Sequence, residues 1–178
     1  MSRTNPLKQK RRLAHRTLLV FGEGLCEEVF IKHLKKLYSY NSNVAITVRR
    51  GKGGTPADVV IDSDKIPGDY ETRVVVIDND KNQKEMELAR QEAKTRKIIL
   101  IENTPCIEAL LLSVLNNGKD FTRKTSDWCK KEFEKKYIEK KKRSEPEQYE
   151  RLFIKSLLDS CRSKSSVLDT MIRLMEGK

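Results

Sequence analysis

The sequence predicts an α/β protein with a mostly parallel four-stranded sheet, flanked by helices and followed by a helical C-terminal extension. Short apolar, β-branched runs alternate with segments of helical periodicity over roughly the first two thirds of the chain. Such alternation is typical of right-handed βαβ units, which place their strands in parallel. After Gly118 the strand patterns stop and only helical patterns follow.

Each expected strand is a short apolar run bounded by turn residues. The third run has four consecutive β-branched residues, a pattern typical of a strand covered on both faces. The expected strands are residues 17–21, 44–48, 73–77 and 97–101.

The helices are expected between and after these strands. Thr55 and Pro56 suit the N-cap and first position of the second helix. His33, between Lys32 and Lys35, is interpreted as a surface histidine. Helices are expected at residues 27–38, 56–64 and 83–96, at a segment beginning with Asn103-Thr104-Pro105, and at 125–140, 146–160 and 165–176.

These patterns divide the chain into three parts. Residues 1–16 are rich in Lys and Arg with little to bury, so they are expected to form a flexible basic arm. Residues 17–118 form the α/β domain, and residues 119–178 form a helical extension packed on it.

The composition favours a nucleic-acid partner. The chain of 178 residues has a formal net charge of +11, and such an excess favours polyanions over a merely soluble basic surface. No apolar run approaches the roughly 20 residues that span a bilayer, and no secretory signal is evident, so we expect a cytoplasmic protein without membrane contact. Four cysteines without a C-x-x-C pair and two histidines argue against zinc or a disulfide framework.

Three acids follow two of the predicted strands. Glu23 comes just after the first strand, and Asp78 and Asp80 come just after the third. Parallel strands bring their carboxyl ends to one edge of the sheet, where ligands bind. Converging carboxylates repel, and Mg²⁺ prefers a few carboxylates together with water and a substrate phosphate. The sequence therefore predicts a Mg²⁺ or Mn²⁺ site, although short Asp-Asn-Asp segments also form plain turns.

Basic residues supply candidate contacts to nucleic acid. The Gly-rich loop after the second strand should join the same edge, where glycines let the backbone approach phosphate. The alternative is a flexible surface loop, and the C-terminal lysines could equally form a solvated helix face. The candidates are Arg49, Arg50, Lys52, Lys81, Lys140 and Lys141.

The order of the acidic motifs resembles a known family. Glu23-Gly24 with Glu27-Glu28, then Asp78-Asn79-Asp80, then the segment 103–108 resemble the RloB-like branch of the Toprim superfamily. That branch is similar in acid pattern to the overcoming-lysogenization-defect nucleases. The resemblance covers residues 17–118 and implies a Toprim-like, Rossmann-like fold. It also implies Mg²⁺-dependent cleavage of DNA or RNA, with a link to restriction loci, phage defence and abortive infection.

The resemblance also implies roles for individual residues. Glu23 would act as general acid/base or metal ligand, and Asp78 and Asp80 would hold the metal. Glu27, Glu28 and Glu108 would be accessory acids, although Glu108 also suits the first turn of a helix. The chain has Ile107 and Ala109 where the family favours aromatic residues. Cys106 is interpreted as a buried small hydrophobe and not as a nucleophile.

Two other functions stay open from the sequence. One is a non-catalytic nucleic-acid-binding or toxin-partner module with the same fold. The other is a receiver-like phosphoacceptor domain, which would need a fifth strand followed by a lysine that the sequence does not show. A partner ATPase or restriction-system component, and a homodimer, also stay open.

Overall fold

The computed structural model describes residues 16–178, so nearly all of the expected basic arm lies outside the described residues. Its four strands are all parallel and lie in the order β2-β1-β3-β4. The expectation of a four-stranded parallel sheet flanked by helices is confirmed, in a Rossmann-like arrangement. The strands are β1 (Arg16–Gly22), β2 (Val44–Arg50), β3 (Thr72–Asp78) and β4 (Ile99–Asn103).

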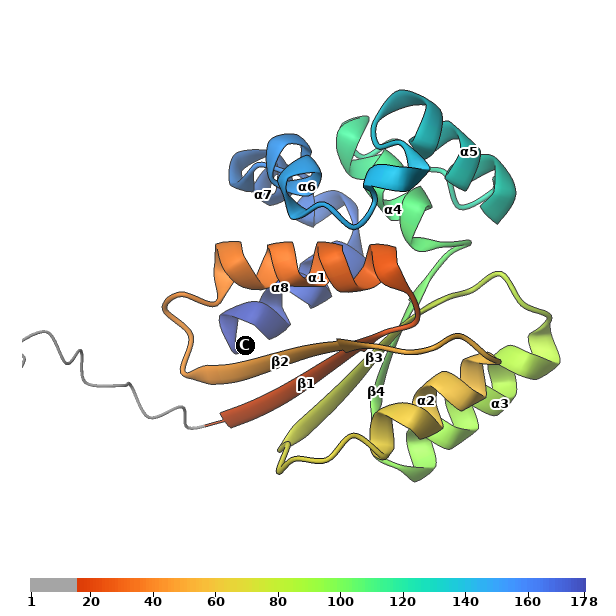
Figure 1. Cartoon of the computed structure of the whole chain (residues 1–178), viewed down its shortest axis with the longest axis vertical. Helices are drawn as coiled ribbons and strands as arrows, with labels where there is room; N and C mark the ends of the chain where they lie inside the picture. The colour runs from red at the N-terminus through yellow and green to blue at the C-terminus, as the bar shows by residue number, and fades with distance from the viewer. Residues whose placement is uncertain (1–15) are drawn as a thin grey trace, which may run out of the picture.

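Helices cover both faces of the sheet. Two of them, α2 and α3, lie on one face, and α1 with the later helices lies on the other (Figure 1). No described helix is long and apolar enough to cross a membrane. The helices are α1 (Leu25–Tyr38), α2 (Pro56–Asp64), α3 (Gln83–Thr95), α4 (Ile107–Leu115), α5 (Ser126–Lys136), α6 (Pro146–Leu152), α7 (Lys155–Cys161) and α8 (Ser166–Glu176), with 3₁₀ turns η1 (Lys140–Lys142) and η2 (Arg162–Lys164).

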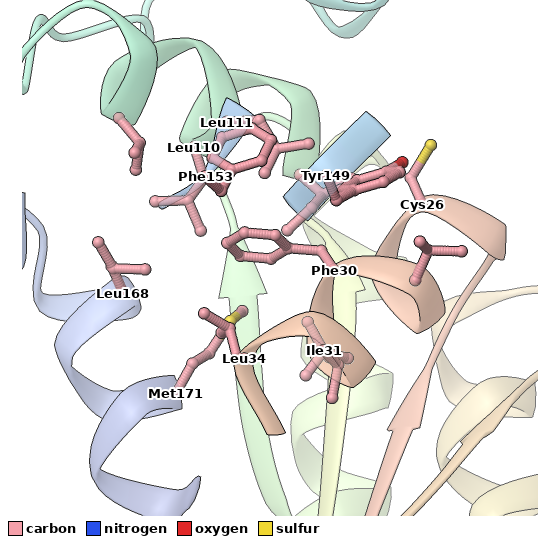
Figure 2. Packing of buried hydrophobic residues seen from close by; sticks show 14 of the residues in the cluster. Cys26, Phe30, Ile31, Leu34, Leu110, Leu111, Tyr149, Phe153, Leu168 and Met171 are labelled. Carbon is pink, nitrogen blue, oxygen red and sulfur yellow. The ribbon is translucent and has the colours of Figure 1, made fainter. Parts of the chain in front are cut away.

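The alternation of strand side chains produces two hydrophobic cores. In β3, Val74 and Val76 pack toward α1, whereas Val75 and Ile77 pack toward α2 and α3. The larger core surrounds Phe30 of α1, with Leu110 of α4, Tyr149 of α6 and Leu168 of α8 nearby (Figure 2). It also includes side chains of α5 and α7. The helices after Gly118 therefore share their core with the parallel sheet.

The fourth strand lies two residues later than predicted. Lys97 adopts a left-handed conformation (φ 56°) that ends α3, and the Ile98 N–H donates to the Ala93 carbonyl at 2.8 Å. Residues 97 and 98 therefore belong to the turn, and β4 extends to Asn103, which pairs with Asp78. The helix expected from residue 103 begins only at Ile107, after a cis peptide between Thr104 and Pro105.

The C-terminal helices are shorter than predicted. The segment expected at 125–140 is helical only to Lys136. The segment expected at 146–160 divides at Phe153, whose backbone leaves the helical region (φ −108°, ψ 61°). The ring of Phe153 packs edge-on against Phe30 at 5.3 Å between centroids, so burial of this ring competes with continuation of the helix.

The expectation for His33 was wrong: its side chain is buried, and Nε2 lies 2.7 Å from the Phe153 carbonyl oxygen.

Candidate functional site

The ends of β1 and β3 bring two of the predicted acids together. The Glu23 N–H donates to the Val76 carbonyl at 3.0 Å, which continues the pairing of the two strands. The Glu23 Oε2 atom accepts a hydrogen bond from the Asp78 N–H, also at 3.0 Å. Residues 55 positions apart therefore meet because their strands are parallel neighbours.

A lysine bridges the two predicted aspartates. The Lys130 ammonium, from α5, lies 3.4 Å from Asp78 Oδ2 and 3.6 Å from Asp80 Oδ2. The other oxygen of Asp78 accepts a hydrogen bond from the Ile107 N–H at the start of α4. Asp78 and Asp80 thus share one cationic neighbour, the Lys130 ammonium.

Two accessory acids lie deeper in the same site. Glu27 is buried at the start of α1, where its Oε2 accepts from the Gly24 N–H at 3.0 Å. Glu108 is buried in the first turn of α4 and is only 2% exposed. With Glu23 and Asp78 they line a pocket of about 350 Å³, whose other walls include Lys130, Lys140 and Arg143.

Burial and mutual repulsion of these acids shift their protonation. Burial, reinforced by the charges of Glu27 and Glu108, raises the pKa of Asp78 to about 8. Burial, partly offset by backbone hydrogen bonds, raises the pKa of Glu27 to about 7. Although burial of the Lys130 amine opposes it, the neighbouring carboxylates raise the pKa of Lys130, so this lysine stays charged. The pocket therefore favours a cation among its acids.

The acids fit a divalent metal. One oxygen of Glu108, Oε2, is buried without a hydrogen-bond partner. Ligand atoms of Asp78, Cys106 and Glu108 lie within 4.8 Å of one another. Burial raises the pKa of the Cys106 thiol, so the thiol stays protonated and the carboxylates are the better ligands for a hard cation.

The remaining predicted residues divide between the site edge and other surfaces. The Gly51 N–H donates to the Gly22 carbonyl at 2.9 Å, which places the basic loop after β2 beside Glu23. Glu28 pairs instead with Lys32 at 2.7 Å and Arg50 at 3.6 Å, away from the pocket.

The exposed basic candidates also occupy different places. Lys140 lines the acidic pocket. Lys81 lies 3.7 Å from Asp80, and Lys141 lies 3.2 Å from Glu139. Arg49 and Lys52 are exposed near the loop after β2.

Sequence reasoning did not single out Lys130 or Arg143 as site residues. Arg143 lies 3.9 Å from Glu108 and also contacts Glu134, and its Nε is buried without a partner. Both residues lie in basic segments in which several other lysines, such as Lys131 and Lys135, are exposed. No local signal distinguishes them, because only the packing of α5 and η1 against the sheet edge brings them to the acids.

The fold and the site together define an α/β protein of Rossmann-like architecture with a buried acidic cluster at the carboxyl ends of parallel strands. Comparisons of the chain with models of protein families, with curated proteins and with solved structures found no match.

Proposed function

We propose that this chain is a Mg²⁺-dependent Toprim-type nuclease that cleaves phosphodiester bonds in DNA or RNA. One observation supports the proposal: the Glu23 carboxylate accepts from the Asp78 N–H at the ends of adjacent parallel strands, and a lysine ammonium lies between Asp78 and Asp80. The family resemblance of these motifs supports the same function, and it supports a setting in phage defence.

The acids would hold the metal in the proposed enzyme. Asp78 and Asp80 share the Lys130 ammonium as a neighbour, and Glu23 lies beside Asp78. A bound divalent ion would neutralise charge on the scissile phosphate and lower the pKa of an attacking water.

The chain's own groups would bind and orient the substrate. Lys130, Lys140 and Arg143 provide positive charge in the same pocket as the acids, where a phosphate of the nucleic acid would lie. Glu23 is less buried than Asp78, so its carboxylate is placed to accept or deliver a proton at the mouth of the pocket.

The direct test is removal of both aspartates. Asp78→Ala with Asp80→Ala should abolish cleavage of plasmid, single strands or tRNA in Mg²⁺, and EDTA should abolish cleavage by the wild type. Asp62→Ala is the control, because Asp62 is a half-exposed aspartate of α2 whose ion-pair partner within residues 16–178 is Lys65. Undiminished cleavage by the double variant would reject the proposal.

The same assays separate the alternatives. Salt-dependent binding with no metal-dependent turnover would indicate a non-catalytic nucleic-acid-binding module. Labelling of Asp78 by acetyl phosphate would indicate a receiver-like domain, although the sheet of residues 16–178 has four strands and its lysine comes from α5.

A further inference from the structure

Two aromatic side chains form a stacked pair on the surface at the start of α5. The rings of Phe121 and Trp128 lie 5.9 Å apart between centroids, with 23° between their planes. Phe121 is the buried member of the pair, whereas Trp128 is 37% exposed. An exposed indole held on a buried ring is a rigid, flat surface, so the Trp128 side chain loses little conformational entropy when a partner binds.

Lysines surround this pair. The Lys119 ammonium lies 5.7 Å from the centre of the Phe121 ring, and the Lys124 ammonium lies 5.1 Å from that of Trp128. In residues 119–131 five basic residues outnumber two acidic ones; the basic residues are Lys119, Arg123, Lys124, Lys130 and Lys131. Flat aromatic surface within a cationic stretch is the combination that binds single-stranded nucleic acid, whose bases stack while its phosphates meet the lysines.

The stacked pair and the acidic site share helix α5. Trp128 precedes Lys130 by two residues, a helix rise of about 3 Å but a rotation of about 200°, so the two side chains point to different faces of α5. The start of this helix is anchored to the loop before α4, since the Ser126 hydroxyl donates to the Pro105 carbonyl at 3.5 Å. A strand stacked on Trp128 would therefore reach Asp78 by passing around α5.

A pocket adjoins the stacked pair at Phe121. Phe121, Thr122 and Lys164 line a cavity of about 300 Å³ beside the end of β4. Asn103 also lines it and is 2% exposed, with its Oδ1 atom lacking a hydrogen-bond partner. A buried amide oxygen without a partner in a cavity of this size suits a donor group such as a base amine.

We propose that the surface formed by Phe121, Trp128, Lys119 and Lys124 binds single-stranded nucleic acid, with a base stacked on Trp128. That this surface guides the strand to the acids rests on the proposed nuclease function; the binding itself does not. A protein partner is less well matched, because the other exposed large apolar side chains come from other elements: Tyr40, Leu88, Ile99 and Ile154.

Trp128 is the only tryptophan of the chain, so its fluorescence reports on the surroundings of this one side chain. The full-length protein is titrated in EDTA with a single-stranded oligonucleotide of about twelve nucleotides and with the matching duplex. We expect the single strand to quench the emission with saturation and the duplex to do so far more weakly. Binding of the single strand without any change in emission would overturn the proposal.

Variants test the surface by polarisation of a labelled single strand. Trp128→Ala, and Lys119→Gln with Lys124→Gln, should each weaken binding by about tenfold. Trp128→Phe keeps a ring against Phe121 and should give an intermediate affinity, which separates loss of stacking from loss of folding. Unchanged affinity of a folded Trp128→Ala variant would contradict the proposal.

A matched control exists in another part of the structure. Lys155 lies 4.8 Å from the centre of the Tyr38 ring, the same type of contact in another place. Lys155→Gln should bind the single strand as the wild type does, and an equal loss there would indicate only a general effect of charge. Because EDTA prevents metal-dependent cleavage, binding with no cleavage in Mg²⁺ would reject the nuclease and leave this surface supported.

Discussion

Burial of the Asp78 carboxylate lowers the stability of the fold, and the proposed enzyme gives this burial a functional reason. Asp78 is 7% exposed and has two acids nearby, Glu27 and Glu108, whose charges oppose its ionisation. Its contact with Lys130 offsets part of that cost, but this lysine is itself partly buried. A site prepared for a cation is therefore destabilising when no cation is bound.

Replacement of Asp78 should show this cost directly. Because its pKa is raised in the folded protein, that state binds more protons between about pH 4 and 8, and wild-type stability falls as the pH rises through this window. Without metal at pH 8.5, Asp78→Asn should be more stable than the wild type by about 1–3 kcal/mol, since Asn still accepts from Ile107 N–H. Urea unfolding in EDTA measures the difference.

Metal should reverse that order. Mg²⁺ should raise the melting temperature of the wild type and have little effect on Asp78→Asn. Asp62→Asn, at a half-exposed position of α2 outside the acidic pocket, is the control and should respond to Mg²⁺ as the wild type does. An Asp78→Asn variant that is less stable in EDTA, or equally stabilised by Mg²⁺, would count against the interpretation of this cluster.

At the scale of elements, the turn between β1 and α1 determines where Glu23 and Glu27 lie. The strand must end and the helix must begin within two residues, so the backbone of Gly22 passes close to α1. A Cβ atom at Gly22 would lie 2.7 Å from Glu27 Cβ and 3.3 Å from the Glu28 nitrogen. Only glycine allows this approach, which holds both acids at the same sheet edge.

Gly22→Ala should therefore destabilise the fold by about 2–4 kcal/mol, because the first turn of α1 must move away from β1. Gly53→Ala is the control: its φ of +86° is unfavourable for alanine, but nothing lies within 4 Å of the added carbon. It should cost only about 1–2 kcal/mol. Chemical denaturation of both variants tests this, and an equal loss in the two would show that the close approach at Gly22 is unimportant.

At the scale of the whole molecule, the C-terminal helices and the parallel sheet share one core. Phe30 of α1 contacts Phe153, and Leu168 of α8 lies in the same cluster (Figure 2). Side chains of α7 belong to it as well. Arg143 reaches Glu108 of α4 from the segment before α6. Helices that share a core with the sheet should unfold with it.

The expected result is one cooperative unfolding transition. Phe153→Ala should lower the free energy of unfolding by about 3–5 kcal/mol, because it leaves a cavity between α1 and α6. Circular dichroism, which reports on the whole chain, and Trp128 fluorescence, which reports on α5, should give coincident curves. Separate transitions in the wild type would show instead that residues after Gly118 form an independent unit.

The sequence alone determined the number of strands, their succession along the chain and the position of the acids after them. Continuous β-branched runs reflect burial on both faces of a sheet, and this local signal needs no tertiary information. It placed Glu23 and Asp78 at one edge because parallel strands share a direction. It misplaced β4 by two residues and missed the break at Phe153, since neither the left-handed turn at Lys97 nor the burial of one ring has a distinctive local pattern.

Only the tertiary structure decided which charges surround Asp78. Lys130 lies 52 positions after Asp78 in the chain. The residues around it do not differ in composition from those around the exposed lysines of the same segment. Glu27 and Glu108 became buried members of the cluster because α1 and α4 both begin at the same sheet edge, whereas Glu28, one residue along, turned toward Arg50. Which charged side chains meet depends on how the helices pack across the sheet. The spacing of these residues along the chain does not predict that packing.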